Sequence, residues 1–301
     1  MSTILRLIPY RIILFRRKLL VTWRKLTKKN FQRKEMIPIL DLHLADHCNL
    51  NCRGCDNFSP LAKETYADPK VFEKDCARMA ELTQGRIREI QLLGGEPLLH
   101  PQIIRLLEIV RKYFPSNTVS IVTNGILLQK QTDEFWTSCR ENKIQLIVTK
   151  YPISVDYQKI EQLAIKQGIV FSFYGNTESV DKSMQCLPLD LEGKQDAYDS
   201  FARCYRANRC ISLDNGKLYT CSLIPYVKYF NSHFKQSLMV SEKDYIDIYQ
   251  INYNDEILDF ISNPMPFCRY CNPKAMIWDI GYGISRKEIG EWVGTNQEIS
   301  N

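Results

Sequence analysis

Three cysteines in one short stretch, Cys48, Cys52 and Cys55, carry the clearest chemical signal of the sequence. Thiolates are favoured ligands of zinc and of iron–sulfur clusters. Three of them can bind three irons of a four-iron cluster and leave the fourth iron open, and an open iron can chelate a small molecule. The alternative is a zinc site that these cysteines share with His43 or His47. The spacing therefore predicts a metal centre of one of these two kinds.

The elements that position these cysteines follow from the pattern of apolar residues. Between about residue 37 and residue 175, short apolar runs alternate with amphipathic stretches, which is typical of parallel βα units. We expect strands at residues 39–44, 89–93, 119–123, 144–149 and 169–173. Because the three cysteines follow the first strand directly, they are expected at the C-terminal edge of the sheet, where ligands face the mouth of a barrel.

Apolar residues at helical spacing predict helices between these strands. Residues 103–114 and 157–164 carry such stripes. Asp156 and Gly168 are placed to cap the second of these helices at its two ends. Both helices are expected to pack on the core and to hold no site.

The composition of the sequence changes at Cys186. Cysteines crowd together beyond it, and an Asp-Asn-Gly turn at residues 214–216 predicts a hairpin between strands 211–213 and 217–219. We therefore expect a second, small cysteine-rich α+β domain. The expected organisation is a basic arm, a partial barrel, this second domain and a C-terminal tail, at residues 1–36, 37–185, 186–285 and 286–301.

Composition indicates a globular protein with one strongly basic end. The chain has 301 residues, 45% of them hydrophobic, which is enough for an ordinary core. Residues 1–34 hold eleven Lys and Arg and no acidic residue, so the other residues carry 29 basic and 34 acidic side chains, a net charge of −5. The overall charge of +6 therefore belongs to the arm, and we expect no nucleic-acid partner.

The basic arm has two interpretations. Its charge-free runs, 12–15 and 19–23, are far shorter than the roughly 20 residues that span a bilayer, and the basic residues 16–18 interrupt any signal-peptide core. The apolar residues that recur at helical spacing are Ile12, Phe15, Leu19, Trp23 and Leu26. A helix with this stripe and a basic face either lies on an anionic membrane surface or packs against its own domain.

The remaining cysteines and histidines are assigned mainly to structure. Eleven cysteines without an export signal indicate metal ligation in the reducing cytoplasm rather than a disulfide framework. Cys76 and Cys139 fall in predicted helices and are expected to be buried thiols. His43 alternates along the first strand and is placed to point into the barrel, whereas His100 and His233 are expected on the surface or in loops.

Polar motifs follow the next three predicted strands. They are Gly94, Gly95, Glu96 and Pro97 after the second, Thr123, Asn124 and Gly125 after the third, and Thr149 and Lys150 after the fourth. With the CxxxCxxC motif, these residues resemble the radical S-adenosylmethionine (SAM) superfamily, and the resemblance extends over most of the chain. It implies a partial (β/α)6 barrel with a SAM-binding [4Fe-4S] cluster.

The resemblance also assigns roles to these motifs. It implies that the GGE residues contact the amino group of SAM, and that Thr149 and Lys150 lie near its ribose and carboxylate. Relatives often carry an aromatic residue immediately before the third cysteine, near the adenine. Gly54 stands there in this chain, so contacts to the adenine are expected from Phe58 or from the fifth strand.

The chemistry that the resemblance implies is radical formation. The cluster passes one electron to SAM, whose carbon–sulfur bond breaks to give a 5′-deoxyadenosyl radical, and this radical abstracts hydrogen from a substrate. The protein must mainly orient the substrate and exclude water. Such an enzyme also implies an electron donor such as flavodoxin or ferredoxin. Cys186, at the predicted domain junction, is a candidate to donate a hydrogen atom to a product radical.

A second set of cysteines lies in the last third of the chain. Cys204 is followed by eleven residues, Gly216, four more residues and Cys221, and then by Cys268 and Cys271 as a CxxC pair. This pattern resembles the twitch domains that are related to SPASM domains and carry an auxiliary [4Fe-4S] cluster. The resemblance implies one auxiliary cluster with four ligands. A zinc ribbon is the alternative.

One ligand of this second set is ambiguous. Cys210 lies closer to the predicted hairpin than Cys204, but only five residues separate it from Gly216, which falls outside the twitch pattern. Both cysteines are candidate ligands, and the pattern favours Cys204.

Three classes of function are consistent with these motifs. The first is a radical SAM oxidoreductase or epimerase acting on a small or lipid-linked substrate, since similar relatives accompany bacterial surface-polysaccharide genes. The second is a peptide-modifying radical SAM enzyme, although the short basic arm resembles no leader-peptide binding domain. The third is a non-catalytic iron–sulfur or zinc protein, which would not cleave SAM.

Overall fold

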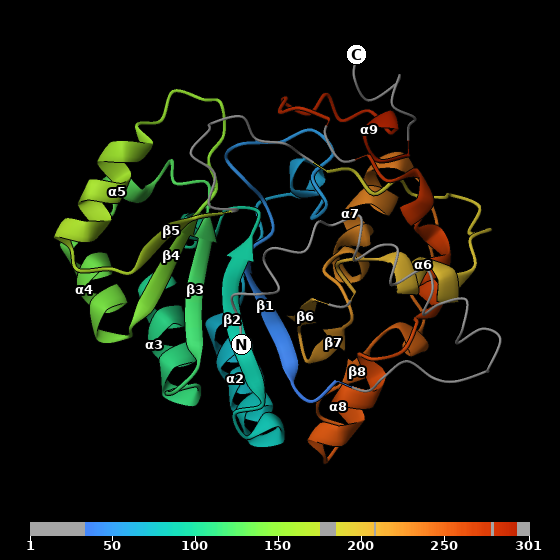
Figure 1. Cartoon of the computed structure of the whole chain (residues 1–301), viewed down its shortest axis with the longest axis horizontal. Helices are drawn as coiled ribbons and strands as arrows, with labels where there is room; N and C mark the ends of the chain where they lie inside the picture. Colours follow the sequence, from blue (N-terminus) through green and yellow to red (C-terminus); the bar gives the residue numbers. More distant parts are fainter. Residues whose placement is uncertain (1–33, 175–184, 208, 278–279, 294–301) are drawn as a thin grey trace, which may run out of the picture.

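Eight strands form one continuous sheet in the computed structural model, which describes residues 34–174, 185–207, 209–277 and 280–293. The strand order is β5-β4-β3-β2-β1-β6-β7-β8 (Figure 1). The strands are β1 Ile37–Ala45, β2 Ile87–Gly94, β3 Thr118–Thr123, β4 Ile144–Val148, β5 Phe171–Phe173, β6 Cys210–Asp214, β7 Lys217–Tyr219 and β8 Ile246–Asp247. All five strands predicted for the barrel are therefore confirmed.

The first six strands run parallel to one another, and β7 pairs antiparallel with both β6 and β8. β1 pairs in parallel with β2 on one side and with β6 on the other, while β6 and β7 form the predicted antiparallel hairpin. The parallel βα arrangement expected from the sequence is thus confirmed. The sheet runs without interruption into the cysteine-rich part of the chain, because β6 continues it beyond β1.

Helices cover the sheet and build the C-terminal part. Figure 1 shows α3, α4 and α5 at the left of the barrel strands and α6, α7 and α8 at the right, beyond β6. The helices are α2 Pro69–Thr83, α3 Ile103–Tyr113, α4 Asp133–Glu141, α5 Tyr157–Lys166, α6 Ala197–Arg203, α7 Leu223–Phe234, α8 Asn254–Phe260 and α9 Gly290–Val293. Asp156 caps α5 as predicted by accepting from the backbone N–H of Lys159 at 2.9 Å.

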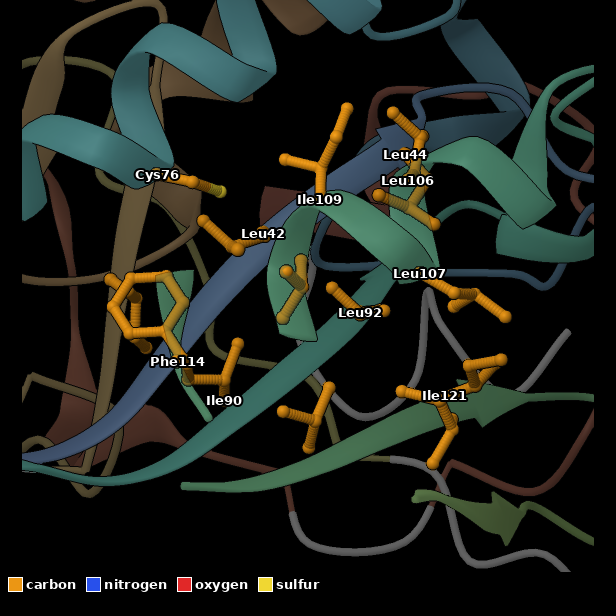
Figure 2. Close-up of a cluster of buried hydrophobic side chains, with 14 of the residues drawn as sticks. Leu42, Leu44, Cys76, Ile90, Leu92, Leu106, Leu107, Ile109, Phe114 and Ile121 are labelled. Atoms are coloured by element: carbon orange, nitrogen blue, oxygen red, sulfur yellow. The ribbon is translucent and has the colours of Figure 1, made fainter. Parts of the chain in front are cut away.

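The larger core lies between the sheet and its helices (Figure 2). Leu42 and Leu44 of β1 and Leu92 of β2 are nearly inaccessible and meet the apolar side of α3. Successive side chains of a strand point to opposite faces, so the residues between them, such as His43, lie on the other face of the sheet. That second face is available for a site.

A smaller core holds the C-terminal part together. Phe58, from the loop after β1, packs with Phe230 of α7 and with Trp292 of α9. All three side chains are almost fully buried. The ring of Phe58 lies 5.6 Å from that of Phe230 and 6.0 Å from that of Trp292. The loop that carries the first three cysteines is therefore fixed from the C-terminal side.

Candidate functional site

The first cysteine loop begins where β1 ends, as predicted. Two glycines bring the end of β2 against it, because a Cβ on Gly94 would lie 2.1 Å from the carbonyl oxygen of Ala45 and one on Gly95 would lie 2.1 Å from that of His47. No side chain fits such distances. The backbone N–H groups of Gly95 and Glu96 use this closeness to donate to Ala45 and His47, at 2.7 and 3.1 Å.

Glu96 connects the GGEP turn with the Thr-Asn-Gly motif after β3. Its buried carboxylate accepts from the hydroxyl of Thr123 at 2.7 Å and from the backbone N–H groups of Asn124 and Leu98 at 3.0 and 3.1 Å. Burial raises the pKa of Glu96 to about 7, while the three hydrogen bonds favour the ionised form. Glu96 thus fastens two loops to each other, and its contact with SAM stays a prediction.

Asn124 then links this assembly to the cysteines. Its side-chain amide donates to Asn49 Oδ1 at 2.8 Å and lies 3.8 Å from Cys48 Sγ. The sulfur of Cys48 also accepts from the backbone N–H of Leu50 at 3.4 Å. The structure therefore brings together the three motifs that the sequence predicted as one site.

Residues 42–157 match the model of the Radical SAM superfamily. This segment is similar to radical SAM domains. Such a domain implies a [4Fe-4S] cluster and SAM, and the matched residues include all three cysteines and the motifs that surround them.

Curated relatives match about a third of the chain. GTP 3′,8-cyclase of Chlorobaculum tepidum is 37% identical over 86 residues, which cover 29% of this chain and 25% of that enzyme. GTP 3′,8-cyclase of Staphylococcus saprophyticus is 32% identical over 110 residues, or 33% of this chain and 31% of that enzyme. The chain thus spans about a quarter to a third of the length of these relatives.

One solved structure resembles nearly the whole chain. BtrN in complex with AdoMet and 2-DOIA superposes with a TM-score of 0.50 at 15% sequence identity, and the match covers 86% of this chain and 99% of BtrN. At this identity the likeness shows the fold alone. It agrees with the α/β partial barrel predicted from the sequence.

Residues after β4 complete the surroundings of the radical SAM motifs. The backbone N–H of Thr149 donates to Thr123 at 2.9 Å, which joins the two loop ends. The ammonium of Lys150 lies 3.9 Å from the ring centroid of Phe173 on β5. Burial, followed by the charges of the three cysteines of the first motif, raises the pKa of Tyr151 well above its ordinary value.

Tyr151 is a site residue that our sequence analysis missed. Its place immediately after the Thr149-Lys150 pair at the end of β4 was the available signal, because the C-terminal ends of barrel strands carry the site. Its ring meets that of Tyr282 at 5.4 Å, edge to face. Tyr282 belongs to the segment, residues 186–285, that was expected to form the second domain.

The C-terminal residues 280–293, here called the strap, cross the first cysteine loop. Backbone bonds join Arg53 N–H to Gly283 at 2.7 Å and Ser285 N–H to Asn51 at 2.8 Å. The indole N–H of Trp292 donates to the carbonyl of Cys55 at 2.9 Å, and Glu291 accepts from the N–H of Gly54 at 3.3 Å. The strap is thus a structural part of this site.

The strap also explains the glycine before the third cysteine. A Cβ on Gly54 would lie 3.1 Å from the carbonyl oxygen of Glu291 and 3.2 Å from Cδ1 of Ile280, and φ of Gly54 is +62°. Both the space and the backbone conformation therefore disfavour a side chain. Strap residues thus occupy the space that a side chain at position 54 would need.

The second set of cysteines gathers in the C-terminal part. Cys204 ends α6, Cys221 follows β7, and Cys268 and Cys271 lie in and after a 3₁₀ turn at Pro266–Tyr270. Burial raises the pKa of Cys271, and the charges of the other three cysteines raise it further. The four thiols are therefore close enough to act on one another electrostatically.

Cys210 interacts mainly with Asp41 and, more weakly, with Cys221. It begins β6, where its thiol interacts with Asp41 of β1, and burial together with the charge of Asp41 raises its pKa to about 12. The charge of Cys204, in contrast, acts on Cys221 and Cys268. This arrangement favours Cys204 as the ligand.

Substitution should separate the two candidates. We expect Cys204→Ala to lose any iron bound by the second set and Cys210→Ala to retain it, because Cys204 lies among the other three thiols whereas Cys210 lies beside Asp41. Iron and sulfide analysis after anaerobic reconstitution measures this. The opposite result would assign the fourth ligand to Cys210.

The donor chemistry of both sets fits iron–sulfur clusters. No three His, Cys, Asp or Glu side chains in the described parts of the chain stand ready to hold a metal ion without movement. The donors are nevertheless thiols in two groups, and partial burial raises the pKa of the Cys48 thiol to about 12, so cluster binding must release its proton. Cys48, Cys52 and Cys55 would hold the first cluster.

A row of polar residues crosses the face of the sheet opposite α2 to α5, here called the inner row. Its members pair with one another across five neighbouring strands and are Ser212, Asp41, Gln91, Ser120 and Gln145. Within the described residues, Asp41 Oδ1 and Ser120 Oγ are buried without a hydrogen-bond partner. Buried polar atoms of this kind are costly unless a further group satisfies them.

The inner row should make stability depend on pH. Burial and the charge of Glu89 raise the pKa of Asp41 from 3.8 to about 8, so the folded state holds a proton that the unfolded state releases. The free energy of unfolding should therefore fall as pH rises between these values, by an amount on the order of a few kcal/mol. Urea unfolding of iron-free protein at several pH values would show a flatter profile for Asp41→Asn, and an unchanged profile would contradict this origin.

The other singled-out residues lie as follows. Cys76 and Cys139 are 1% and 0% exposed in α2 and α4, which confirms them as buried thiols. Cys186 is also buried, and its thiol lies 3.5 Å from the carbonyl of Glu291 in the strap. His233 is exposed and His100 lies in a loop, as expected. The ring of His100 is nevertheless buried and bonds to the carbonyl of Ala67 at 2.9 Å.

Proposed function

We propose that this protein is a radical SAM enzyme that cleaves SAM at a [4Fe-4S] cluster held by Cys48, Cys52 and Cys55. The observation that carries the proposal is the hydrogen-bonded chain from the cysteine loop through Asn124 to Glu96, which unites the family motifs at one edge of the sheet. When bound, the cluster and SAM would supply a 5′-deoxyadenosyl radical.

The chain's own residues hold this site in place and shield it. The glycines of the GGEP motif let the strand end approach, and Glu96 fixes the loop after β3. The strap crosses the cysteine loop through Trp292 and Glu291. These contacts keep the loop rigid and exclude water, which protects a reactive intermediate.

The substrate we propose is a polar organic molecule, namely a sugar or a lipid-linked saccharide, from which the enzyme abstracts hydrogen in an oxidation or epimerisation. The inner row supports a polar substrate, since it presents carboxyl, amide and hydroxyl groups where an apolar substrate would leave them unsatisfied. Asp41 and Ser120 hold the unpartnered atoms that such a molecule would engage.

The second set of cysteines would hold an auxiliary [4Fe-4S] cluster. The proposal rests on the mutual electrostatic influence of Cys204, Cys221, Cys268 and Cys271. Such a cluster would accept an electron or anchor substrate, and a flavodoxin or ferredoxin would supply reducing electrons.

Anaerobic assays test the proposed function directly. After reconstitution, the protein should bind about eight irons per chain and, with dithionite and SAM, should release 5′-deoxyadenosine. A zinc protein or a purely electron-transferring protein would release none, and that outcome would refute the proposal. About four irons with intact SAM cleavage would remove only the auxiliary cluster.

Peripheral membrane binding through the arm is a further part of the proposal. Residues 1–33 lie outside the described residues, and Lys34 at their end donates its backbone N–H to Ser262 at 3.0 Å. No helix within the described residues is long and apolar enough to cross a bilayer. Each basic residue near anionic lipid contributes about 1 kcal/mol, so the intact protein should co-sediment with anionic liposomes at low salt. Equal sedimentation of a version lacking residues 1–34 would contradict this role.

A further inference from the structure

A buried arginine lies between the two cysteine sets. The side chain of Arg206 is only 14% exposed and forms an ion pair with Asp56, the residue that follows Cys55 of the first motif. Arg206 itself is two residues beyond Cys204 of the second set, and its carbonyl accepts from the N–H of Cys210 at 2.9 Å. Two segments that are far apart in sequence thus meet at this one cation.

Thiols of both cysteine sets act electrostatically on Arg206. Burial lowers the pKa of its guanidinium, and the thiols that oppose this effect are those of Cys221, Cys210, Cys55 and Cys271. A guanidinium keeps its charge when buried, so the cation is permanent.

Other basic residues nearby do not have this position. Arg203, at the end of α6, bonds Asp199 at 3.0 Å, and Lys274 bonds the other oxygen of the same carboxylate at 2.9 Å. Their side chains are 28% and 61% exposed. Solvent screens such charges more than it screens that of Arg206.

We propose that Arg206 is a positioning residue that joins the two cysteine sites and sets the one-electron reduction potential of the auxiliary cluster, an inference that rests on the proposed function of the second set. A reduced cluster carries one more negative charge than an oxidised one, so a fixed cation beside its ligands stabilises the reduced form. Asp56 partly compensates that cation and holds it beside the first cysteine loop.

The direction in which two substitutions shift the midpoint potential of the auxiliary cluster tests this role. Arg206→Gln should lower the midpoint potential of the auxiliary cluster by at least about 59 mV, which is a tenfold loss in the one-electron equilibrium constant. Asp56→Asn should raise the potential, because it leaves the cation uncompensated. The measurement is a dithionite titration followed by electron paramagnetic resonance, in protein whose Cys48, Cys52 and Cys55 are replaced by Ala so that only the auxiliary cluster contributes.

Two control variants show whether the charge of Arg206 or its packing sets the potential. Arg206→Lys keeps the charge and should keep most of the potential, and Arg203→Gln removes an equal charge from the same region and should leave the potential unchanged. An unchanged potential in Arg206→Gln would overturn the proposal. Should Arg206→Gln fail to load iron, Asp56→Asn decides, and an unchanged or lowered potential there would also overturn it.

The outcome is distinguishable from failure of the proposed function. Wild-type protein with about four irons would overturn both the auxiliary cluster and the role of Arg206. Wild-type protein with about eight irons, together with an unmoved potential in the variants, would overturn the role of Arg206 alone.

Discussion

Replacing Cys48, Cys52 and Cys55 together by Ala is expected to abolish release of 5′-deoxyadenosine and to lower bound iron from about eight to about four per chain. The three thiols are the donors at the end of β1, so the open iron disappears with them. The second set belongs to another core and should keep its iron. Iron analysis and chromatography of the SAM reaction measure the two effects in one preparation.

Cys139→Ala provides the matched control. This thiol is 0% exposed in α4 and belongs to the larger core, so its loss should change neither iron content nor SAM cleavage. Retained release of 5′-deoxyadenosine by the triple variant would refute the site assignment, whatever its iron content.

Trp292→Ala should destabilise the protein and empty the first site preferentially. The indole is 3% exposed, packs against Phe58 and Phe234, and donates to the carbonyl of Cys55. Removing a buried aromatic side chain typically costs about 3–5 kcal/mol of unfolding free energy. Because this side chain also holds the cysteine loop, iron retention at the first site should fall more than at the second.

Two further variants separate these effects. Trp136→Ala removes an indole that is 2% exposed in the other core, so it should lose comparable stability without selective loss of the first cluster. Trp292→Phe retains most of the packing and loses one hydrogen bond, which contributes about 0.5–1.5 kcal/mol. Equal loss of iron from both sites in Trp292→Ala would show that the strap has only a general structural role.

The barrel strands and one helix cap could be predicted because their signals lie within a few consecutive residues. The strands recur as short apolar runs, and Asp156 was recognisable as a cap from its immediate neighbours. The three radical SAM motifs were predicted for the same reason, since each directly follows a strand. Parallel strands bring such ends to one edge of the sheet whatever the rest of the chain does.

Contacts between distant segments could not be predicted in this way. Gly283 and Trp292 of the strap reach the first cysteine loop through a backbone and an indole hydrogen bond, and such bonds leave no periodic signal. His100 lies in a loop, as expected. That its ring is buried and bonds to the carbonyl of Ala67 could not be read from its neighbours in sequence. The role of Glu96 in fixing the loop after β3 likewise depends on tertiary packing.

The position of β1 between β2 and β6 has a consequence for how the chain reaches its native state. Leu40 and Leu42 pair with Ile211 and Leu213, so one edge of β1 stays open during synthesis until the ribosome has released β6. Such non-local parallel pairing forms slowly, and an open apolar strand edge invites association with other chains. The strand that leads into the first cysteine loop is therefore completed late, and newly made protein would depend on chaperones until its C-terminal half emerges.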